Sequence, residues 1–560
     1  MIYYICKYTP VELLAGFGAQ AKLLDSLPEN FDRADSCGHP NLCGYGKAII
    51  EKVSTGTVKE LVLVNCCDTI RRIYDILREK NYCTYLYFMD LPHETGHCQV
   101  ELFTAELFRL AESYKKYSGK EWNYDLFKAA FGTEKKPPDR YIALIGAHAG
   151  PLLSARIKDS LNYPIENLTC AGNREVLFTI TPEQQKSSRC LSERILAEYA
   201  RELLQQLPCM RMNDTGSRRR FWNAPGIAGI IYHSIKFCDY YGAEYAELKD
   251  AATVPLLKIE SDYTRQSSGQ FATRLGAFSE LLHGTERKNQ PRKGKVPVES
   301  SAKNYFAGID SGSTSTDVVI LDGDCTVAGW SIIPTGGGAS SGAEKCLSAA
   351  LKKAGISRGR VRTVISTGYG RKYIQGSTDN ITEITCHAKG AFFLNKKVRT
   401  IIDIGGQDSK IIALNDDGSV AGFVMNDKCS AGTGRFLDMM SNALNIPLEK
   451  MSSLGLNCTE DITISSMCTV FAESEVVSLV AQNKSVNDIV YGLNKSVAAK
   501  ISALAGRIRT RDVYMMTGGV AQNKGVVRAI ENKMKISLCI TDYAQICGAL
   551  GAALFAVERC

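Results

Sequence analysis

Three glycine-rich turns follow one another in the second half of the chain, each after a short apolar run typical of a strand. They lie in FAGIDSGSTSTDVVILDG (306–323), IIDIGGQD (401–408) and YMMTGGVAQNKGVVRAI (514–530). Glycines at such turns let backbone N–H groups approach a phosphate closely. A Walker loop would instead need G-x-x-x-x-G-K-[ST] leading into a helix. One such turn occurs by chance in many sheet proteins, but three in this order predict a nucleotide-binding protein.

Two cysteines lie close to the second and third turns. Cys429 is in NDKCSAGTGRF (426–436), and Cys468 precedes TVFAESEVVSLVAQ (469–482). We expect both at helix N-termini, where the thiol pKa falls and the iron-binding thiolate is favoured. A [4Fe–4S] cluster needs four thiolates, which a two-fold dimer of this chain would supply. A lone cysteine is more often a small buried hydrophobe, but the pair beside a nucleotide turn predicts one interfacial cluster per dimer.

Length and composition limit the classes of protein to which this chain can belong. A chain of 560 residues exceeds one hydrophobic core, so we expect two to four domains. No apolar run approaches the roughly 18 residues of a membrane span, and the N-terminus lacks signal-peptide features, so we expect a cytoplasmic protein without a membrane partner. Twenty cysteines in such a chain favour metal or redox chemistry over disulfides. The basic run at 287–296 is typical of a linker, and nothing predicts nucleic-acid binding.

Residues 1–283 alternate strand and helix patterns. This alternation predicts a doubly wound α/β domain in two halves, with a break near residues 132–140, and ligands at the C-terminal ends of the strands. A polar, basic linker is expected over 284–304, followed by a second domain over 305–560.

Several N-terminal cysteines lie near predicted element ends. They are Cys43, Cys66, Cys67, Cys170, Cys209 and Cys238. Three or more thiolates meeting in one cleft would make a second iron–sulfur site. Structural zinc stays an alternative, although no C-x-x-C pair of zinc-ribbon spacing is present.

The turns and their surroundings resemble a known superfamily. In their order they are similar to the actin-like ATPases, whose two ribonuclease-H-like lobes clamp a nucleotide. A closer resemblance covers nearly all of 306–556, through STGYGRKYI, TEITCHAKGA, IDIGGQDSKII, NDKCSAGTGRFLDMM, CTVFAESEVVSLVAQN, TGGVAQNKGV and GALGAALFA. These motifs are similar to the activators of 2-hydroxyacyl-CoA dehydratases and to benzoyl-CoA reductase ATPase subunits. The resemblance implies a homodimer formed through the C-terminal domain, with one [4Fe–4S] cluster on Cys429 and Cys468.

The N-terminal half resembles the dehydratase component that those activators reduce. The similarity rests on YTPVELLAGFGA, ADSCGHPNLCGYGKAIIE, CCDTIRRIYDIL, FMDLP, KFCDYYGAE and ESDYTRQSSGQFATRLGAFSE. It implies Cys43, Cys67 and Cys238 as cluster ligands. Some relatives hold a double-cubane [8Fe–9S] cluster on six cysteines, for which the additional candidates are Cys37, Cys170 and Cys209. No acyl-CoA recognition signature is evident, so the substrate stays open between an acyl-CoA and another small molecule.

The expected function is ATP-driven electron transfer from the interfacial cluster to the N-terminal one, with ferredoxin or flavodoxin as external donor. Asp310 and Asp403 would organise Mg²⁺ and water, and Gln407 would orient the attacking water. ATP would be held by Gly312, Ser313, Thr314, Gly405, Gly406, Gly518, Gly519 and Gln522. The alternatives are a non-redox small-molecule kinase of the same fold and a cluster-maturation ATPase.

Overall fold

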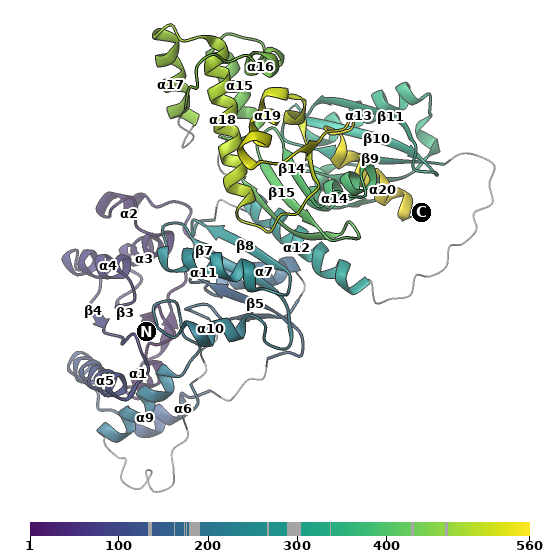
Figure 1. The fold of residues 1–560 in the computed structure, drawn as a ribbon. Coiled ribbons are helices and arrows are strands. Elements are labelled where there is room, and N and C mark those ends of the chain that lie inside the picture. The colour runs from purple at the N-terminus through teal and green to yellow at the C-terminus, as the bar shows by residue number, and fades with distance from the viewer. Residues whose placement is uncertain are drawn as a thin grey trace. The chain divides into compact units, whose positions relative to one another are not determined.

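The computed structural model describes the chain except residues 133–136, 162, 173, 175, 179–190, 266–267, 288–303, 337, 427–429, 465–468 and 560. It contains two compact units, Met1–Leu275 and Gly276–Cys560 (Figure 1). Helix α12 (Ser268–Arg287) continues past residue 283, and most of the expected linker lies outside the described residues. The domain boundaries at 283/284 and 304/305 stay a prediction.

The first unit contains two four-stranded parallel sheets with the same strand order. The first sheet has the order β2-β1-β3-β4 and the second β6-β5-β7-β8. The strands are β1 (Ile2–Tyr4), β2 (Ala21–Leu23), β3 (Glu60–Val64), β4 (Tyr85–Met89), β5 (Tyr141–Gly146), β6 (Ile165–Asn167), β7 (Ile227–Ile235) and β8 (Leu256–Ser261).

Helices connect these strands, as the alternating sequence pattern predicted. They are α1 (Val11–Ala15), α2 (Asp32–Cys37), α3 (Gly44–Ser54), α4 (Asp68–Glu79), α5 (His97–Ser118), α6 (Tyr124–Ala129), α7 (Pro151–Leu161), α9 (Glu193–Leu204), α10 (Thr215–Phe221), α11 (Asp239–Ala251) and α12. The doubly wound class is confirmed. In an open parallel sheet of this order, the crevice opens where the connections diverge, between β1 and β3 and between β5 and β7.

The second unit contains two five-stranded sheets with one repeated topology. The orders are β11-β10-β9-β12-β13 and β16-β15-β14-β17-β18; in each, three antiparallel strands precede two parallel ones. This is the pair of ribonuclease-H-like lobes predicted for an actin-like ATPase. The strands are β9 (Tyr305–Ser311), β10 (Ser315–Asp322), β11 (Val327–Pro334), β12 (Val361–Thr367), β13 (Asp379–Asn380), β14 (Thr400–Ile404), β15 (Ser409–Leu414), β16 (Val420–Asn426), β17 (Tyr514–Thr517) and β18 (Leu538–Cys539).

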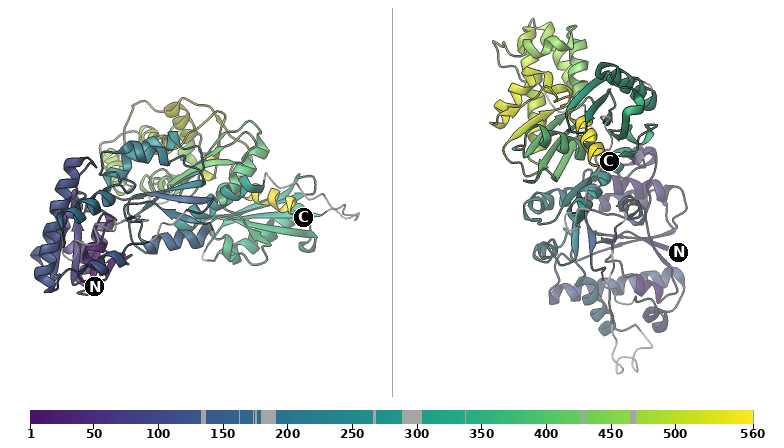
Figure 2. Two further views of the ribbon diagram at one scale, coloured as in Figure 1. Left: turned by 90° about the horizontal axis from the view of Figure 1, so that it is seen from below. Right: turned by 90° about the vertical axis from the view of Figure 1, so that its right-hand side faces the viewer.

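Helices of this unit fall into groups that Figures 1 and 2 separate clearly. Helices α15–α18 gather at one end of the unit, away from α13 and β11. The helices are α13 (Ala339–Ala354), α14 (Glu383–Leu394), α15 (Gly434–Ala443), α16 (Leu448–Leu454), α17 (Thr469–Ala481), α18 (Val486–Ala505), α19 (Lys524–Met534) and α20 (Cys547–Glu558), with short 3-10 turns at Arg358–Arg360, Arg371–Tyr373 and Gly519–Gln522. No helix within the described ranges is long and apolar enough to cross a membrane.

Helices α14 and α20 cross at glycines. A Cβ on Gly390 would lie 2.3 Å from the Cys547 carbonyl oxygen, and one on Gly551 would lie 1.8 Å from that of Cys386. The backbones can approach this closely because neither glycine has a side chain. The crossing fixes α14 beside the end of β9.

Candidate functional site

The two predicted aspartates lie on either side of one imidazole. Asp310 lies near the end of β9 and Asp403 lies on β14; His387 of α14 places Nε2 3.9 Å from Asp310 Oδ2 and Nδ1 3.5 Å from Asp403 Oδ1. The Thr517 hydroxyl, at the end of β17, donates a 2.9 Å hydrogen bond to Asp403 Oδ1. A Cβ on Gly548 would lie 2.2 Å from Asp310 Oδ2, so a glycine is required there. The structure therefore brings both lobes' aspartates to one place.

A buried lysine holds Asp403 of this pair together with two further carboxylates. Lys410 Nζ donates to Asp408 Oδ1 at 2.8 Å and to Asp403 Oδ2 at 3.3 Å, and it lies 3.4 Å from Glu383 Oε1. The Tyr369 hydroxyl donates to the other Asp408 oxygen at 3.0 Å. Lys410 was not predicted from the sequence, although a lysine in the otherwise apolar strand SKIIAL already required a buried partner.

The charges of this group are set by burial and by each other. Burial, reinforced by Asp317 and Glu383, raises the pKa of Asp310 well above its ordinary value. Burial opposes ionisation of Asp403 too, but His387, Lys410 and the Thr517 hydroxyl stabilise its carboxylate and lower its pKa. Without a cation, Asp403 is thus the charged member of the pair and Asp310 favours its neutral form. A divalent cation would supply the charge that Asp310 needs to ionise.

The predicted phosphate turns face one another. A Cβ on Gly406 would lie 2.1 Å from Thr314 Oγ1, so the double-glycine turn and the hairpin turn are in close contact. The backbone of Gly312 donates to Ser315 within that hairpin. Gly518 has φ +86°, a conformation that favours glycine, and begins the third turn. The side chains of Ser313, Thr314, Gln407 and Gln522 are exposed.

The double-glycine turn is bonded to the segment that follows Cys429. The Gly405 carbonyl accepts from the N–H of Gly434 at 2.9 Å, and the Gly406 carbonyl accepts from Arg435 at 2.7 Å. The start of α15 is therefore hydrogen-bonded directly to this turn.

Cys429 and Cys468 lie outside the described residues, but their neighbours are placed. The hydroxyls of Ser430 and Thr469, each directly after one of these cysteines, share a 2.8 Å hydrogen bond. Helix α17 begins at Thr469, as predicted. The helix expected after Cys429 is α15, which begins at Gly434 with Thr433 as N-cap; Gly432, with φ +93°, turns the chain just before it, so the helix begins five residues beyond Cys429.

In the first unit, cysteines lie at the C-terminal ends of the parallel strands. Cys6 follows β1, Cys67 follows β3 and is the N-cap of α4, and Cys238 follows β7 and is the N-cap of α11. Cys43 is the N-cap of α3 and accepts from the Gly46 N–H at 3.5 Å. Cys170 follows β6, and its carbonyl accepts from the N–H beside Cys6 at 3.3 Å. Strand ends of both sheets therefore meet.

Seven thiols of this unit influence one another electrostatically, and we call them the thiol centre: Cys6, Cys43, Cys66, Cys67, Cys170, Cys209 and Cys238. Burial and the charges of three other thiols raise the pKa of Cys170, and burial raises that of Cys43 to about 11. The hydrogen bond from Cys66 lowers the pKa of Cys67 to about 7. Neither Cys6 nor Cys66 was among the ligands predicted from the sequence.

Cys37 does not join the thiol centre. Burial raises the pKa of its thiol, and its charged neighbours are Lys80 and Glu51 rather than another cysteine. Within the described part of the chain, no three His, Cys, Asp or Glu side chains surround a single point as one metal ion requires. Cluster ligands bind different irons, so thiolates spread over a wider space suit a cluster. Seven grouped thiols fit this chemistry.

The thiol centre predicts selective alkylation of the cluster-free chain. Iodoacetamide reacts with thiolates, so labelling of Cys67 should rise as pH increases through about 7. Cys43 should stay unreactive there, because its pKa is about 11. Peptide mass spectrometry after brief labelling at pH 6, 7 and 8 measures both, with Cys98, an exposed cysteine on α5, as the control. Faster labelling of Cys43 than of Cys67 at pH 7 would contradict the assignment.

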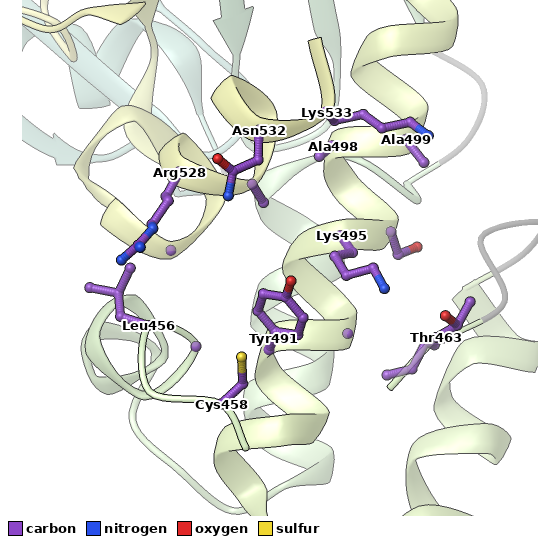
Figure 3. A pocket seen from close by; sticks show the side chains of 16 residues that line it. Leu456, Cys458, Thr463, Tyr491, Lys495, Ala498, Ala499, Arg528, Asn532 and Lys533 are labelled. Atoms are coloured by element: carbon purple, nitrogen blue, oxygen red, sulfur yellow. The ribbon is translucent and has the colours of Figure 1, made fainter. Parts of the chain in front are cut away.

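A separate cavity of about 500 Å³ lies between α18, α19 and residues 455–464 (Figure 3). Tyr491 and Lys495 project into it from α18 and Arg528 from α19. Lys495 is paired with Asp461. Among the described residues, none of those predicted for hydrolysis or metal binding lines it.

Known proteins resemble each half of the chain. Residues 307–556 match the BadF/BadG/BcrA/BcrD ATPase family, and residues 6–144 and 145–282 match the 2-hydroxyglutaryl-CoA dehydratase D-component family. The 2-hydroxyisocaproyl-CoA dehydratase activator of Clostridioides difficile is 42% identical over 46% of this chain and 96% of its own length. The activator of lactoyl-CoA dehydratase of Anaerotignum propionicum is 44% identical over 45% of this chain and 98% of its own length.

Solved structures include the same kind of relative. The crystal structure of component A of the Acidaminococcus fermentans (R)-2-hydroxyglutaryl-CoA dehydratase is 41% identical and covers 46% of this chain and 98% of its own, with a TM-score of 0.45. Sequence identity over nearly the full length of the dehydratase activators, together with the two actin-like lobes, shows that this chain belongs to the BadF/BadG/BcrA/BcrD ATPase family and joins that ATPase to a dehydratase D-component half.

Proposed function

We propose that this chain hydrolyses ATP in its C-terminal half to drive low-potential electrons from an interfacial [4Fe–4S] cluster, shared by two copies, to a second iron–sulfur centre in its N-terminal half. The observation that carries the proposal is the pair of hydrogen bonds from Gly434 and Arg435 to the double-glycine turn. They join a phosphate turn to the segment that follows Cys429. Nucleotide chemistry would therefore act on a cluster ligand's surroundings.

The nucleotide site would work through positioned charge. Asp310 and Asp403 would organise Mg²⁺ and water, and Gln407 would orient the attacking water. Lys410 keeps Asp403 and its neighbours from repelling one another, and His387 holds the aspartates of the two lobes in register. Backbone N–H groups of the three turns would hold the phosphates.

Binding of ATP would be transmitted through the backbone. The Ser409 hydroxyl, at the start of β15, donates to the Gly432 carbonyl at 2.6 Å, which adds a third hydrogen bond to the two that the double-glycine turn makes with the segment after Cys429. Ser430 then reaches Thr469 at the start of α17. Movement of the phosphate turn would thus reach the surroundings of both cysteines.

Homodimerisation is supported by the exposed apolar side chains of α17. Val470, Phe471, Val477 and Val480 are exposed, with 66% of Phe471 accessible. A second copy would cover these side chains and bring a second Cys429 and Cys468 to the same axis, giving the four thiolates of a [4Fe–4S] cluster.

The thiol centre would hold the second cluster. Cys43, Cys67 and Cys238 would serve as ligands at helix starts, and Cys6, Cys66, Cys170 and Cys209 provide enough further thiols for a double-cubane cluster. Such clusters supply one-electron transfer at low potential. The external donor would be ferredoxin or flavodoxin, and the acceptor an acyl-CoA or another small molecule.

The test is nucleotide-dependent reduction of the N-terminal cluster. Anaerobic, reduced full-length protein given MgATP should show reduction of this cluster, and protein given a non-hydrolysable analogue should show much less. An uphill transfer of about 300 mV costs roughly 7 kcal/mol for one electron, which thermal fluctuation does not supply. Spectroscopy that resolves the two clusters measures the effect.

Matched variants assign the signals. A Cys43, Cys67 and Cys238 triple serine variant should lose the N-terminal signal, whereas Cys429→Ser and Cys468→Ser should lose interfacial iron but keep ATP binding. Equal reduction with and without hydrolysis would show that the ATPase serves another purpose.

A further inference from the structure

His148 is buried in the unit that contains the thiol centre, and its ring has no hydrogen-bond partner among the described residues. Only 3% of the residue is accessible, and neither Nδ1 nor Nε2 has a partner within the described residues. A neutral imidazole always carries one donor and one acceptor. Leaving such groups buried and unpaired costs roughly 1–3 kcal/mol each, so a native structure rarely keeps them without a reason.

The position of His148 indicates that reason. It follows β5 at the crevice edge of the second sheet, where the connections diverge between β5 and β7. Gly146 has φ +106° and turns the chain there. A Cβ added at Gly146 would lie 2.2 Å from the carbonyl oxygen of His233, so only glycine leaves room for that backbone. The next residue after His148, Ala149, donates to Thr169 Oγ1 at 3.3 Å and accepts from Asn167. The backbone directly after His148 is therefore hydrogen-bonded to the segment that ends in Cys170.

The ring is held in place by stacking. Its centroid lies 3.6 Å from that of Tyr45, with 18° between the planes. Tyr45 lies two residues after Cys43, and the charges of Cys170 and Cys66 act on its hydroxyl. His148 is thus stacked on a tyrosine that lies two residues after Cys43 and is influenced by the charges of Cys170 and Cys66, while its own polar atoms stay unpaired.

A second buried histidine shows the contrast. His233, fully buried on β7, has Nδ1 3.2 Å from the Ala147 carbonyl oxygen and Nε2 2.7 Å from Ser261 Oγ. Its partners account for its burial. For His148, the described residues offer none.

We propose that the N–H of His148 donates a hydrogen bond to a sulfur of the iron–sulfur cluster held by the thiol centre. The inference rests on the proposed function, since it requires that cluster. Burial lowers the pKa of His148 to about 3, so the ring is neutral and keeps one nitrogen as acceptor. Hydrogen bonds to the sulfurs are among the factors that set the potential of such clusters, because they stabilise the more negative, reduced state. His148 would raise the midpoint potential and ease acceptance of an electron.

The test compares His148→Phe with His148→Gln in the full-length, anaerobically purified Cys429→Ser/Cys468→Ser background, where the N-terminal cluster alone gives the signal. Phenylalanine keeps the ring stacked on Tyr45 but cannot donate, whereas glutamine restores a donor. Redox titration followed by electron paramagnetic resonance should show His148→Phe with a more negative midpoint potential. If the equilibrium constant for one-electron reduction falls about tenfold, the midpoint potential shifts by about 59 mV. His148→Gln should recover most of it.

Stability of the cluster-free chain gives a second readout of opposite sign. After iron removal, His148→Phe should unfold at the same or a higher temperature than the parent, because an unpaired buried imidazole is replaced by an apolar ring. His233→Phe should unfold at a lower temperature, because the Ala147 carbonyl and the Ser261 hydroxyl each lose their hydrogen-bond partner.

The outcomes separate the two proposals. If the background protein holds no iron in its N-terminal half, the proposed function fails. If it holds iron and His148→Phe leaves the midpoint potential and spectrum unchanged, the hydrogen bond to the cluster is overturned. A lower unfolding temperature of the cluster-free His148→Phe chain together with an unchanged potential would assign His148 a purely structural role.

Discussion

Asp403→Asn should lower kcat for ATP hydrolysis by about 100- to 1,000-fold, the usual cost of removing one preorganised electrostatic group from a catalytic site. Asparagine keeps the shape and the hydrogen bond from Thr517 but removes the charge that Lys410 and His387 stabilise. Steady-state phosphate release measures the change, and the iron content of the N-terminal half should stay unchanged because the thiol centre lies in the other unit.

The matched control is Asp324→Asn, which changes an exposed aspartate in the β10–β11 turn of the same unit. It should hydrolyse ATP at the parent rate. An Asp403→Asn variant within threefold of the parent would remove Asp403 from the catalytic machinery.

Lys410→Met should destabilise the second unit by about 3–5 kcal/mol, the typical cost of removing one partner from a buried ion network. Methionine fills the same space but leaves Asp403, Asp408 and Glu383 facing one another with only 4–8% of each side chain accessible. Calorimetry on the full chain should show the transition of this unit moving to lower temperature while that of the first unit stays in place.

A second variant shows whether charge is the cause. Adding Glu383→Gln to Lys410→Met should recover part of the loss, because one repelling carboxylate is removed. Lys372→Met, at an exposed lysine, should change stability by less than about 0.5 kcal/mol. Equal stability of Lys410→Met and the parent would show that the lysine does not hold the carboxylates together.

The parts of this architecture that could be predicted from the sequence are those that depend on short, local stretches of residues. Apolar strands that end in glycines predicted a nucleotide site with Asp310 and Asp403 at strand ends, and the resemblance that these turns carry implied the two lobes. Alternating strands and helices identified the doubly wound sheets. Cys43 was placed at a helix start because a helix pattern begins directly after it, and it is the N-cap of α3.

The parts that sequence reasoning missed depend on distant contacts. His387 reaches the aspartates only because α14 crosses α20 at Gly390 and Gly551, glycines separated by much of the unit. Cys6 joins other thiols because β1 pairs with β3 in parallel, a register that no short window reveals.

Because helix α20 belongs to the core of the first lobe, that lobe can complete its hydrophobic core only at the end of synthesis. Leu550 and Ala553 pack against Val319 and Leu321 of the first lobe, and Ala552 packs against Phe306. The first lobe therefore lacks part of its core until the ribosome has translated the whole second lobe. A nascent chain paused before residue 547 would expose the apolar side of β10, and chaperones would meet this lobe unfinished even though its strands emerged first.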